Sequence, residues 1–243
     1  MAIYALSDLH YAYGFPDKTM EVFSDYWKDY MQRIEDSWNE TVSDDDLVLV
    51  PGDICWATRL DEASVDFAKL DSLSGRKIIS RGNHDYWWST MSKIRAFLQQ
   101  NGFSTIDFIR NDDVVIEGNA IIAGTRGWAF PGSSEFSEEK DRKIYERELL
   151  RLGICIKSME KADPEHKKKW IVTLHYPPVI KTIHRTGFGD MLREAQVDIC
   201  VYGHLHGLGR RNIFEGKTED NAFTEYICAS SDHLLFKPRL IVE

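Results

Sequence analysis

Short apolar runs alternate along the chain with longer segments in which apolar residues recur every three or four positions. The short runs are rich in Val and Ile, which favours strands that are buried on both faces. They predict strands at residues 2–6, 47–50, 77–79, 114–116, 120–123, 170–174, 199–202, 226–229 and 240–242.

The longer segments predict four amphipathic helices between these strands. The first is expected over residues 18–41, and the last is a long charged helix over residues 135–161. Two shorter helices are expected between them. The apolar positions that define the four helices are Phe23, Trp27, Tyr30, Ile34 and Trp38; Ala63, Phe67 and Leu70; Met91, Ile94, Phe97 and Leu98; and Ile144, Leu149, Leu152 and Ile156.

This alternation of strands and helices predicts an α/β fold. The pattern of residues 107–123 predicts consecutive strands, so we do not expect the sheet arrangement to be purely parallel. No internal repeat, low-complexity tract or linker rich in Pro, Gly and Ser divides the chain. We therefore expect a single domain over residues 1–243.

The net charge of −9 narrows the classes of partner. Binding to a long nucleic acid or to a membrane surface depends on clustered Lys and Arg, so neither is expected. A small phosphorylated substrate remains possible, because bound metals can supply local positive charge. The oligomeric state is left open.

Cysteine usage and the first residues bear on the compartment. The four cysteines, Cys55, Cys155, Cys200 and Cys228, form no CxxC pair, which favours a reducing compartment over a disulfide framework. Residues 1–6 carry no charged leader, and no run of 18 apolar residues is present, so the expected location is the cytoplasm.

Chemistry is concentrated where five of the predicted strands end. In α/β folds, ligands bind at the carboxyl ends of strands, so these five endings are expected to converge on one place. The residues that follow the strands are Ser7-Asp8-Leu9-His10, Pro51-Gly52-Asp53, Arg81-Gly82-Asn83-His84-Asp85, His175 and Gly203-His204-Leu205-His206.

The residue types at these ends suit a metal. Positions i and i+2 of an extended chain face the same way, so Asp8 with His10, and His204 with His206, can each present two ligands to one site. Carboxylate, imidazole and amide oxygen together favour Mn, Fe or Zn. One ion rarely needs as many ligands as the chain offers, whereas two ions that share a carboxylate would use them all. The expected ligands are Asp8, His10, Asp53, Asn83, His175, His204 and His206.

In this order, the motifs D-x-H, G-D, G-N-H-D, H and G-H-L-H resemble the calcineurin-like metallophosphoesterase superfamily. The resemblance runs from Asp8 to His206, which is most of the chain. It implies two facing mixed β-sheets flanked by helices, a four-layer α/β/β/α sandwich. It also implies a dinuclear metal centre and hydrolysis of phosphoester bonds.

The resemblance implies a role for each residue of the motifs. Asp53 corresponds to the ligand that bridges the two metals, His84 to the histidine that protonates the leaving oxygen, and Asp85 to the acid that orients it. Two metals about 3.5–4 Å apart acidify the attacking water and clamp the phosphoryl oxygens, so that hydroxide attacks phosphorus in line. The expected ligands of the first metal are Asp8, His10 and His206, and those of the second are Asn83, His175 and His204.

Four further residues are expected to contact substrate. Arg81 resembles the phosphate-binding arginine of the protein serine/threonine phosphatases, although those enzymes carry Glu where this chain has Asp85. Trp56 and Trp128 can form an aromatic wall, with core packing as the plainer interpretation. Trp56 also stands where purple acid phosphatases of the superfamily carry a tyrosine ligand. His184 lies in the loop after His175, whereas His166 and His233 are expected at the surface.

The balance of one obvious cation and several aromatic residues favours a small phosphodiester as substrate. A phosphomonoesterase, including one like the protein phosphatases, is the alternative. Two readings outside this class also stay open. The fold can serve as a metal-binding interaction scaffold, although here every expected ligand and His84 are present. A single-metal hydrolase acting on another bond would leave several of the expected ligands without a use.

Overall fold

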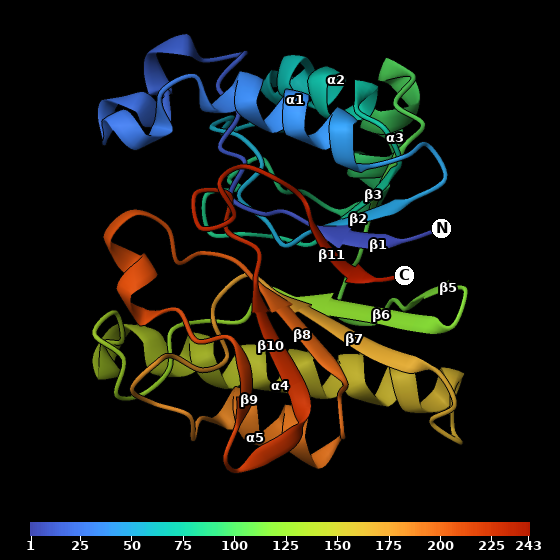
Figure 1. The fold of residues 1–243 in the computed structure, drawn as a ribbon, viewed down its shortest axis with the longest axis vertical. Coiled ribbons are helices and arrows are strands. Elements are labelled where there is room, and N and C mark those ends of the chain that lie inside the picture. The colour runs from blue at the N-terminus through green and yellow to red at the C-terminus, as the bar shows by residue number, and fades with distance from the viewer. The chain divides into compact units, whose positions relative to one another are not determined.

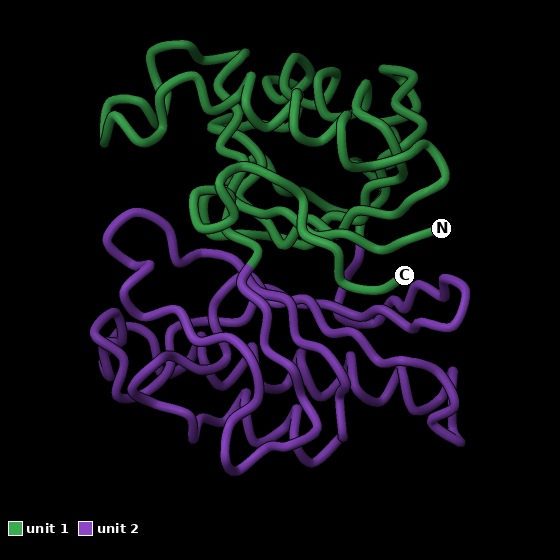
Figure 2. The backbone as a smooth tube through the Cα atoms, viewed as in Figure 1, with its two compact units in different colours: residues 1–108, 229–243 green, residues 109–228 purple.

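The structure, a computed structural model, describes all residues from 1 to 243. The chain divides into two compact units (Figure 2). Unit 1 comprises residues 1–108 and 229–243, and unit 2 comprises residues 109–228. Both contain a mixed β-sheet with helices, so the α/β fold with two mixed sheets is confirmed.

Unit 1 is built on a five-stranded sheet in the order β11-β1-β2-β3-β4. Strands β1 (Ile3–Ala5), β2 (Leu47–Val50), β3 (Arg76–Ile79) and β4 (Ile106–Phe108) are parallel, and β11 (Arg239–Val242) is antiparallel to β1. Helices α1 (Tyr30–Thr41), α2 (Ser64–Ser72) and α3 (Met91–Asn101) cover one face of this sheet (Figure 1). Their apolar stripes, with Trp38, Phe67 and Ile94 fully buried, form the core of the unit.

Unit 2 is built on a six-stranded sheet in the order β5-β6-β7-β8-β10-β9. Its parallel centre consists of β6 (Ala120–Thr125), β7 (Lys169–Leu174), β8 (Ile199–Tyr202) and β10 (Asn221–Cys228). The edge strands β5 (Val115–Glu117) and β9 (Gly216–Thr218) are antiparallel to their neighbours. Helices α4 (Glu138–Ala162) and α5 (Gly187–Glu194) lie on one face (Figure 1).

The predicted strands are all present, two of them with the predicted bounds, 47–50 and 199–202. Strand β10 begins at Asn221 instead of residue 226, because it continues into polar positions that pair with β9. Strand β9 and helix α5 were not predicted, since both are short and neither contains an apolar run of its own. Strand β4 falls largely within residues 107–123, for which the sequence predicts consecutive strands.

The helix predicted over residues 18–41 is wrong in its first half. Helix α1 begins only at Tyr30, because Asp29 before it has a left-handed backbone with φ of 55°. The preceding residues form three short 3₁₀ turns, Pro16–Lys18, Met20–Val22 and Asp25–Trp27. Trp27 packs into the core from the last of these turns, whereas Phe23 is 70% exposed. The apolar spacing therefore reflects contacts made by turns.

The structure also bears on the cysteines and on the possibility of a membrane span. The four cysteines are buried and free. None of the helices combines the length and the apolar character that crossing a membrane requires.

Candidate metal centre

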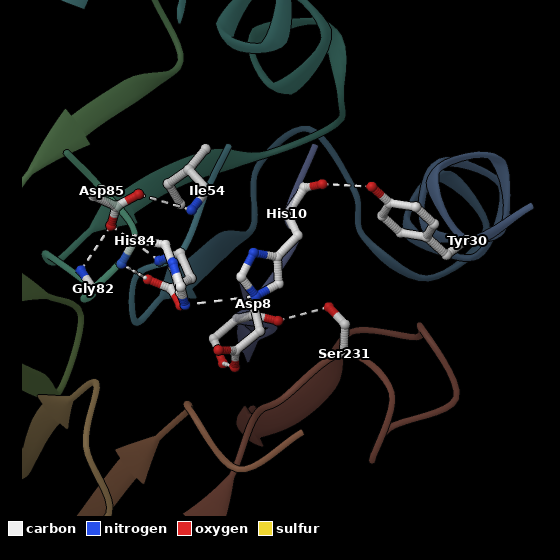
Figure 3. A network of polar contacts seen from close by, with 10 residues as sticks. Asp8, His10, Tyr30, Ile54, Gly82, His84, Asp85 and Ser231 are labelled. Carbon is white, nitrogen blue, oxygen red and sulfur yellow. Dashed lines mark hydrogen bonds and ion pairs between the residues drawn. The ribbon is translucent and has the colours of Figure 1, made fainter. Parts of the chain in front are cut away.

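The loops after β1 and β2 bring three of the predicted metal ligands together in unit 1. One ligand atom each from Asp8, His10 and Asp53 lies within 4.8 Å of the other two. All three side chains are fully buried, and Nε2 of His10 lies 3.8 Å from Oδ2 of Asp53. Figure 3 shows the polar network around them.

These three residues share an unusual backbone conformation. Asp8, His10 and Asp53 have φ angles of 55°, 45° and 56°, in the left-handed region that side chains other than glycine rarely occupy. Such strain persists only where the surroundings hold it, and it tends to occur at functional sites. Here the two loops hold each other, since the amide of Asp8 donates to Gly52 O at 3.1 Å and that of His10 to Asp53 O at 3.0 Å.

Asp85 anchors the loop after β3 to the loop after β2. Its carboxylate accepts hydrogen bonds from the amides of Asp53 (3.0 Å), Ile54 (2.9 Å) and Gly82 (2.7 Å) (Figure 3). Both of its oxygens are therefore engaged by the backbone. The predicted contact with the His84 ring is not among these bonds, and the orienting role of Asp85 stays a prediction.

Gly82 and Asp53 lie so close together that the loop tolerates no side chain at position 82. A Cβ at Gly82 would lie 2.1 Å from Oδ1 of Asp53. The same carboxylate oxygen accepts the amide of His84 at 2.8 Å. The G-N-H-D motif thus fixes the predicted bridging carboxylate by sterics on one side and by a hydrogen bond on the other.

The electrostatics of this cluster favour a cation. Burial raises the pKa of Asp53 well above its ordinary value, and the neighbouring carboxylates of Asp85 and Asp8 raise it further. Burial also raises the pKa of Asp85. A divalent cation between these groups would offset both effects, because it replaces the lost hydration and balances the negative charge. Two carboxylates and one imidazole fit Mn, Fe or Zn.

Aromatic rings pack against His10 of the cluster. Trp56 stacks on His10 with ring centroids 4.8 Å apart and meets the edge of His84 at 5.1 Å. His84 lies 5.6 Å from His10 by the same measure and is partly exposed. Trp87, by contrast, is buried against Phe67.

The C-terminal segment supports the site in a way that the motifs gave no reason to expect. The hydroxyl of Ser231 donates to the carbonyl of Ser7 at 2.6 Å, and the amide of Ser7 donates to Ala229 O at 2.7 Å. The hydroxyl of Ser7 in turn donates to Oδ2 of Asp8 at 2.6 Å. From the helix side, Tyr30 donates to the His10 carbonyl (Figure 3).

Unit 2 brings two of its three predicted ligands together. The rings of His175 and His204 have centroids 5.2 Å apart, and Tyr176 packs on His204 at 4.1 Å. His204 has a left-handed backbone, with φ of 70°. Its Nε2 lies 2.9 Å from Oε2 of Glu135, and this hydrogen bond lowers the pKa of Glu135. His206 follows in the same loop, where its amide donates to the carbonyl of His204.

The predicted substrate-binding residues have different surroundings. In unit 1, Nε of Arg81 is a buried donor with no hydrogen-bond partner. In unit 2, Trp128 packs against Tyr176 and donates from its indole nitrogen to Asp141. His184 packs on Phe214 at 4.4 Å.

Glu135 was not found from the sequence, because it stands in a loop of small residues before α4 and outside every motif. The predicted ligand Asn83 lies partly exposed in the loop after β3.

Comparison with known proteins identifies the family. The calcineurin-like phosphoesterase family matches residues 1–208, and the chain belongs to this family. Together with the cluster of Asp8, His10 and Asp53, this membership supports a hydrolase that cleaves phosphoesters with metal ions. A search of curated protein sequences finds no match.

Two solved structures share the fold over nearly the whole chain. One is a phosphopantetheinyl hydrolase from Mycobacterium tuberculosis, with 15% identity, a TM-score of 0.51, and coverage of 99% of this chain and 95% of that one. The other is a protein of unknown function from Aquifex aeolicus, with 15% identity, a TM-score of 0.50, and coverage of 98% and 95%. At this identity the likeness concerns the fold alone.

Proposed function

We propose that the protein is a dinuclear metal-dependent phosphoester hydrolase whose substrate is a small phosphodiester. The observation that carries this proposal is the cluster of Asp8, His10 and Asp53, three buried ligands on strained strand-end loops. The remaining ligands, which complete the set drawn from the motifs, are Asn83, His175, His204 and His206. When bound, a metal pair acidifies the attacking water and neutralises charge on the phosphoryl oxygens.

His84 is proposed as the proton donor to the leaving oxygen. Its amide is held by the Asp53 carboxylate, so its backbone is fixed beside the ligand cluster. Its ring lies against Trp56 and His10 and remains partly exposed, which leaves it accessible to a substrate. Proton transfer of this kind contributes roughly 10²–10⁴-fold to rate. Asp85 contributes by fixing the loop that carries His84.

The choice of a phosphodiester rests on the balance of aromatic and cationic groups. Trp56 lies directly on the ligand cluster, and an aromatic face stacks on a base or an aryl group for about 1–3 kcal/mol per base. The buried donor of Arg81 supports the alternative, a phosphomonoester whose dianion gains more from a guanidinium fork. The phosphopantetheinyl hydrolase of the same fold makes phosphopantetheinyl compounds reasonable test substrates.

Metal content and turnover test this proposal together. The protein is dialysed, loaded with Mn²⁺ and analysed for metal per chain. Its kcat/KM is then compared for bis-(4-nitrophenyl) phosphate, 4-nitrophenyl phosphate and a phosphopantetheinyl conjugate. We expect two ions per chain and a preference for the diester. One ion per chain would refute the dinuclear centre, and bound metal without any turnover would favour the interaction scaffold.

The variants His84→Asn and Arg81→Ala refine the assignment. His84→Asn is expected to keep both metals and to lose most turnover, with the largest loss on poor leaving groups. If the protein prefers the monoester, and Arg81→Ala abolishes this preference, then the substrate is a phosphomonoester and not a phosphodiester.

A further inference from the structure

Helix α4 presents a second apolar face that the fold of unit 2 does not cover. Its core side consists of Tyr145, Glu148, Leu152, Cys155, Ile156 and Met159, all buried. On the opposite flank, Leu150 is 72% exposed and Ile154 is 45% exposed. A contiguous apolar patch that is left exposed can mark an interaction site.

These side chains line a groove along the helix. The groove has a volume of about 690 Å³, and Met191 of α5 forms one wall. Gly153 has no side chain to fill the groove, and a Cβ added there would meet only the Met191 methyl group, at 3.4 Å. A groove with an exposed leucine beside a glycine can accept a similar leucine from another helix. The residues of α4 that line it are Glu146, Leu149, Leu150, Gly153, Ile154 and Lys157.

Charged residues of α4 extend the groove at both ends. Together with Leu150 and Gly153 they form a row, here called the seam, whose members are spaced alternately three and four residues apart. This is the spacing found where two helices pack side by side. The members are Lys143, Glu146, Leu150, Gly153, Lys157 and Glu160, and the four charged ones are exposed. Along the seam the pattern is positive, negative, apolar, apolar, positive, negative.

Read in reverse, the seam is complementary to itself. An antiparallel second copy therefore places opposite charges together and seats a leucine at the glycine, whereas a parallel copy in register places like charges together. Such an isologous contact is the usual form of a homodimer interface. The antiparallel register pairs Lys143 with Glu160, Glu146 with Lys157, Leu149 with Ile154 and Leu150 with Gly153.

We propose that α4 is the interface of a symmetric homodimer, in which two copies of α4 pack antiparallel about a twofold axis between Leu150 and Gly153. The occupant of the groove is thus α4 of a second copy of this chain. This inference is independent of the proposed hydrolase activity, because no residue of the seam belongs to the metal centre or its loops.

Charge reversal tests the interface and its direction. Glu146→Lys places lysine against Lys157 in both halves of the dimer, and Lys157→Glu places glutamate against Glu146. Since each substitution converts two attractive pairs into repulsive ones, we expect the dimer dissociation constant to rise about tenfold or more. It is measured by sedimentation velocity over a concentration series, with circular dichroism as the check on folding.

Mixing the two variants provides the decisive result. In a mixed dimer, the new lysine faces the new glutamate and the native lysine faces the native glutamate, so an equal mixture should dimerise as wild type does. The double variant should also recover, and Lys217→Glu, an exposed reversal on β9, should change nothing. A wild-type protein that stays monomeric at about 100 µM, or a mixture as weak as the single variants, would overturn the proposal.

Discussion

Replacement of Asp85 by Asn separates two roles for this residue. If Asp85 only orients the His84 ring, the variant should lose rate and keep its stability and its metals. The structure indicates a different role, because three backbone amides from two loops donate to the carboxylate and none of these bonds involves the His84 ring. Asp85→Asn should therefore loosen the loops that carry Asp53 and His84.

The size of the effect follows from the hydrogen bonds. The amide oxygen of Asn can replace Oδ2 and keep the bonds from Asp53 and Gly82. The NH₂ group then faces the amide of Ile54, so a buried donor meets a donor. One hydrogen bond to a charged group is lost, at about 1.5–3 kcal/mol, and a buried N–H is left unsatisfied at a further cost of about 1–3 kcal/mol. We expect a net loss of about 3 kcal/mol of stability in the metal-free protein.

Thermal unfolding and metal analysis measure the two consequences. For a chain of this length, about 3 kcal/mol lowers Tm by roughly 6–12 °C. Metal retained after dialysis should fall as well, since the amide of Ile54, next to Asp53, loses its fixed partner. Asp45→Asn, an exposed substitution of the same chemistry, serves as control. An Asp85→Asn variant with the Tm and metal content of wild type, but with reduced turnover on poor leaving groups, would refute the anchoring role.

Four further predictions follow from individual residues. Asp53→Asn should sharply reduce retained metal by elemental analysis, because it removes a buried carboxylate that lies 3.8 Å from His10, and full occupancy would contradict this. Trp56 cannot coordinate iron, so an iron-loaded sample should lack a strong tyrosinate band in its visible spectrum. Burial lowers the pKa of Lys77 to about 8. The unfolded chain therefore binds more protons above that pH, and stability should rise by about 2 kcal/mol between pH 8 and about pH 10, a rise absent in Lys77→Met. Gly153→Ala should stabilise the monomer against urea by about 0.5–1 kcal/mol, since Gly is unfavourable inside a helix, while weakening the dimer.

Sequence reasoning succeeded where a local pattern and a global rule agree. The buried strands β2 and β8 have the predicted bounds because Pro51 and Gly203 directly follow their apolar runs. Both residues are less favourable in a strand than the Val, Leu and Ile residues before them. The rule that ligands bind at strand ends selects Asp8, His10 and Asp53, and these three lie together.

It failed where a contact depends on residues far apart in the chain. Ser231 supports the carbonyl next to Asp8 from 224 positions away, and no local pattern encodes this pairing. Glu135 reaches His204 across 69 positions from a loop without periodicity. The predicted helix over residues 18–41 failed for a different reason, because turns can place apolar side chains on a core at helical spacing, and only the left-handed Asp29 reveals the break.

The residues with a left-handed backbone bear on function. Nine residues other than glycine have positive φ in this chain, and four of them, Asp8, His10, Asp53 and His204, are predicted metal ligands. Each such conformation costs of order 1–3 kcal/mol, so four of them would consume much of the stability of an ordinary domain. In unit 1 the strain is held by hydrogen bonds from neighbouring loops and from the C-terminal segment. Part of the energy that holds the predicted ligands in these conformations therefore comes from the fold.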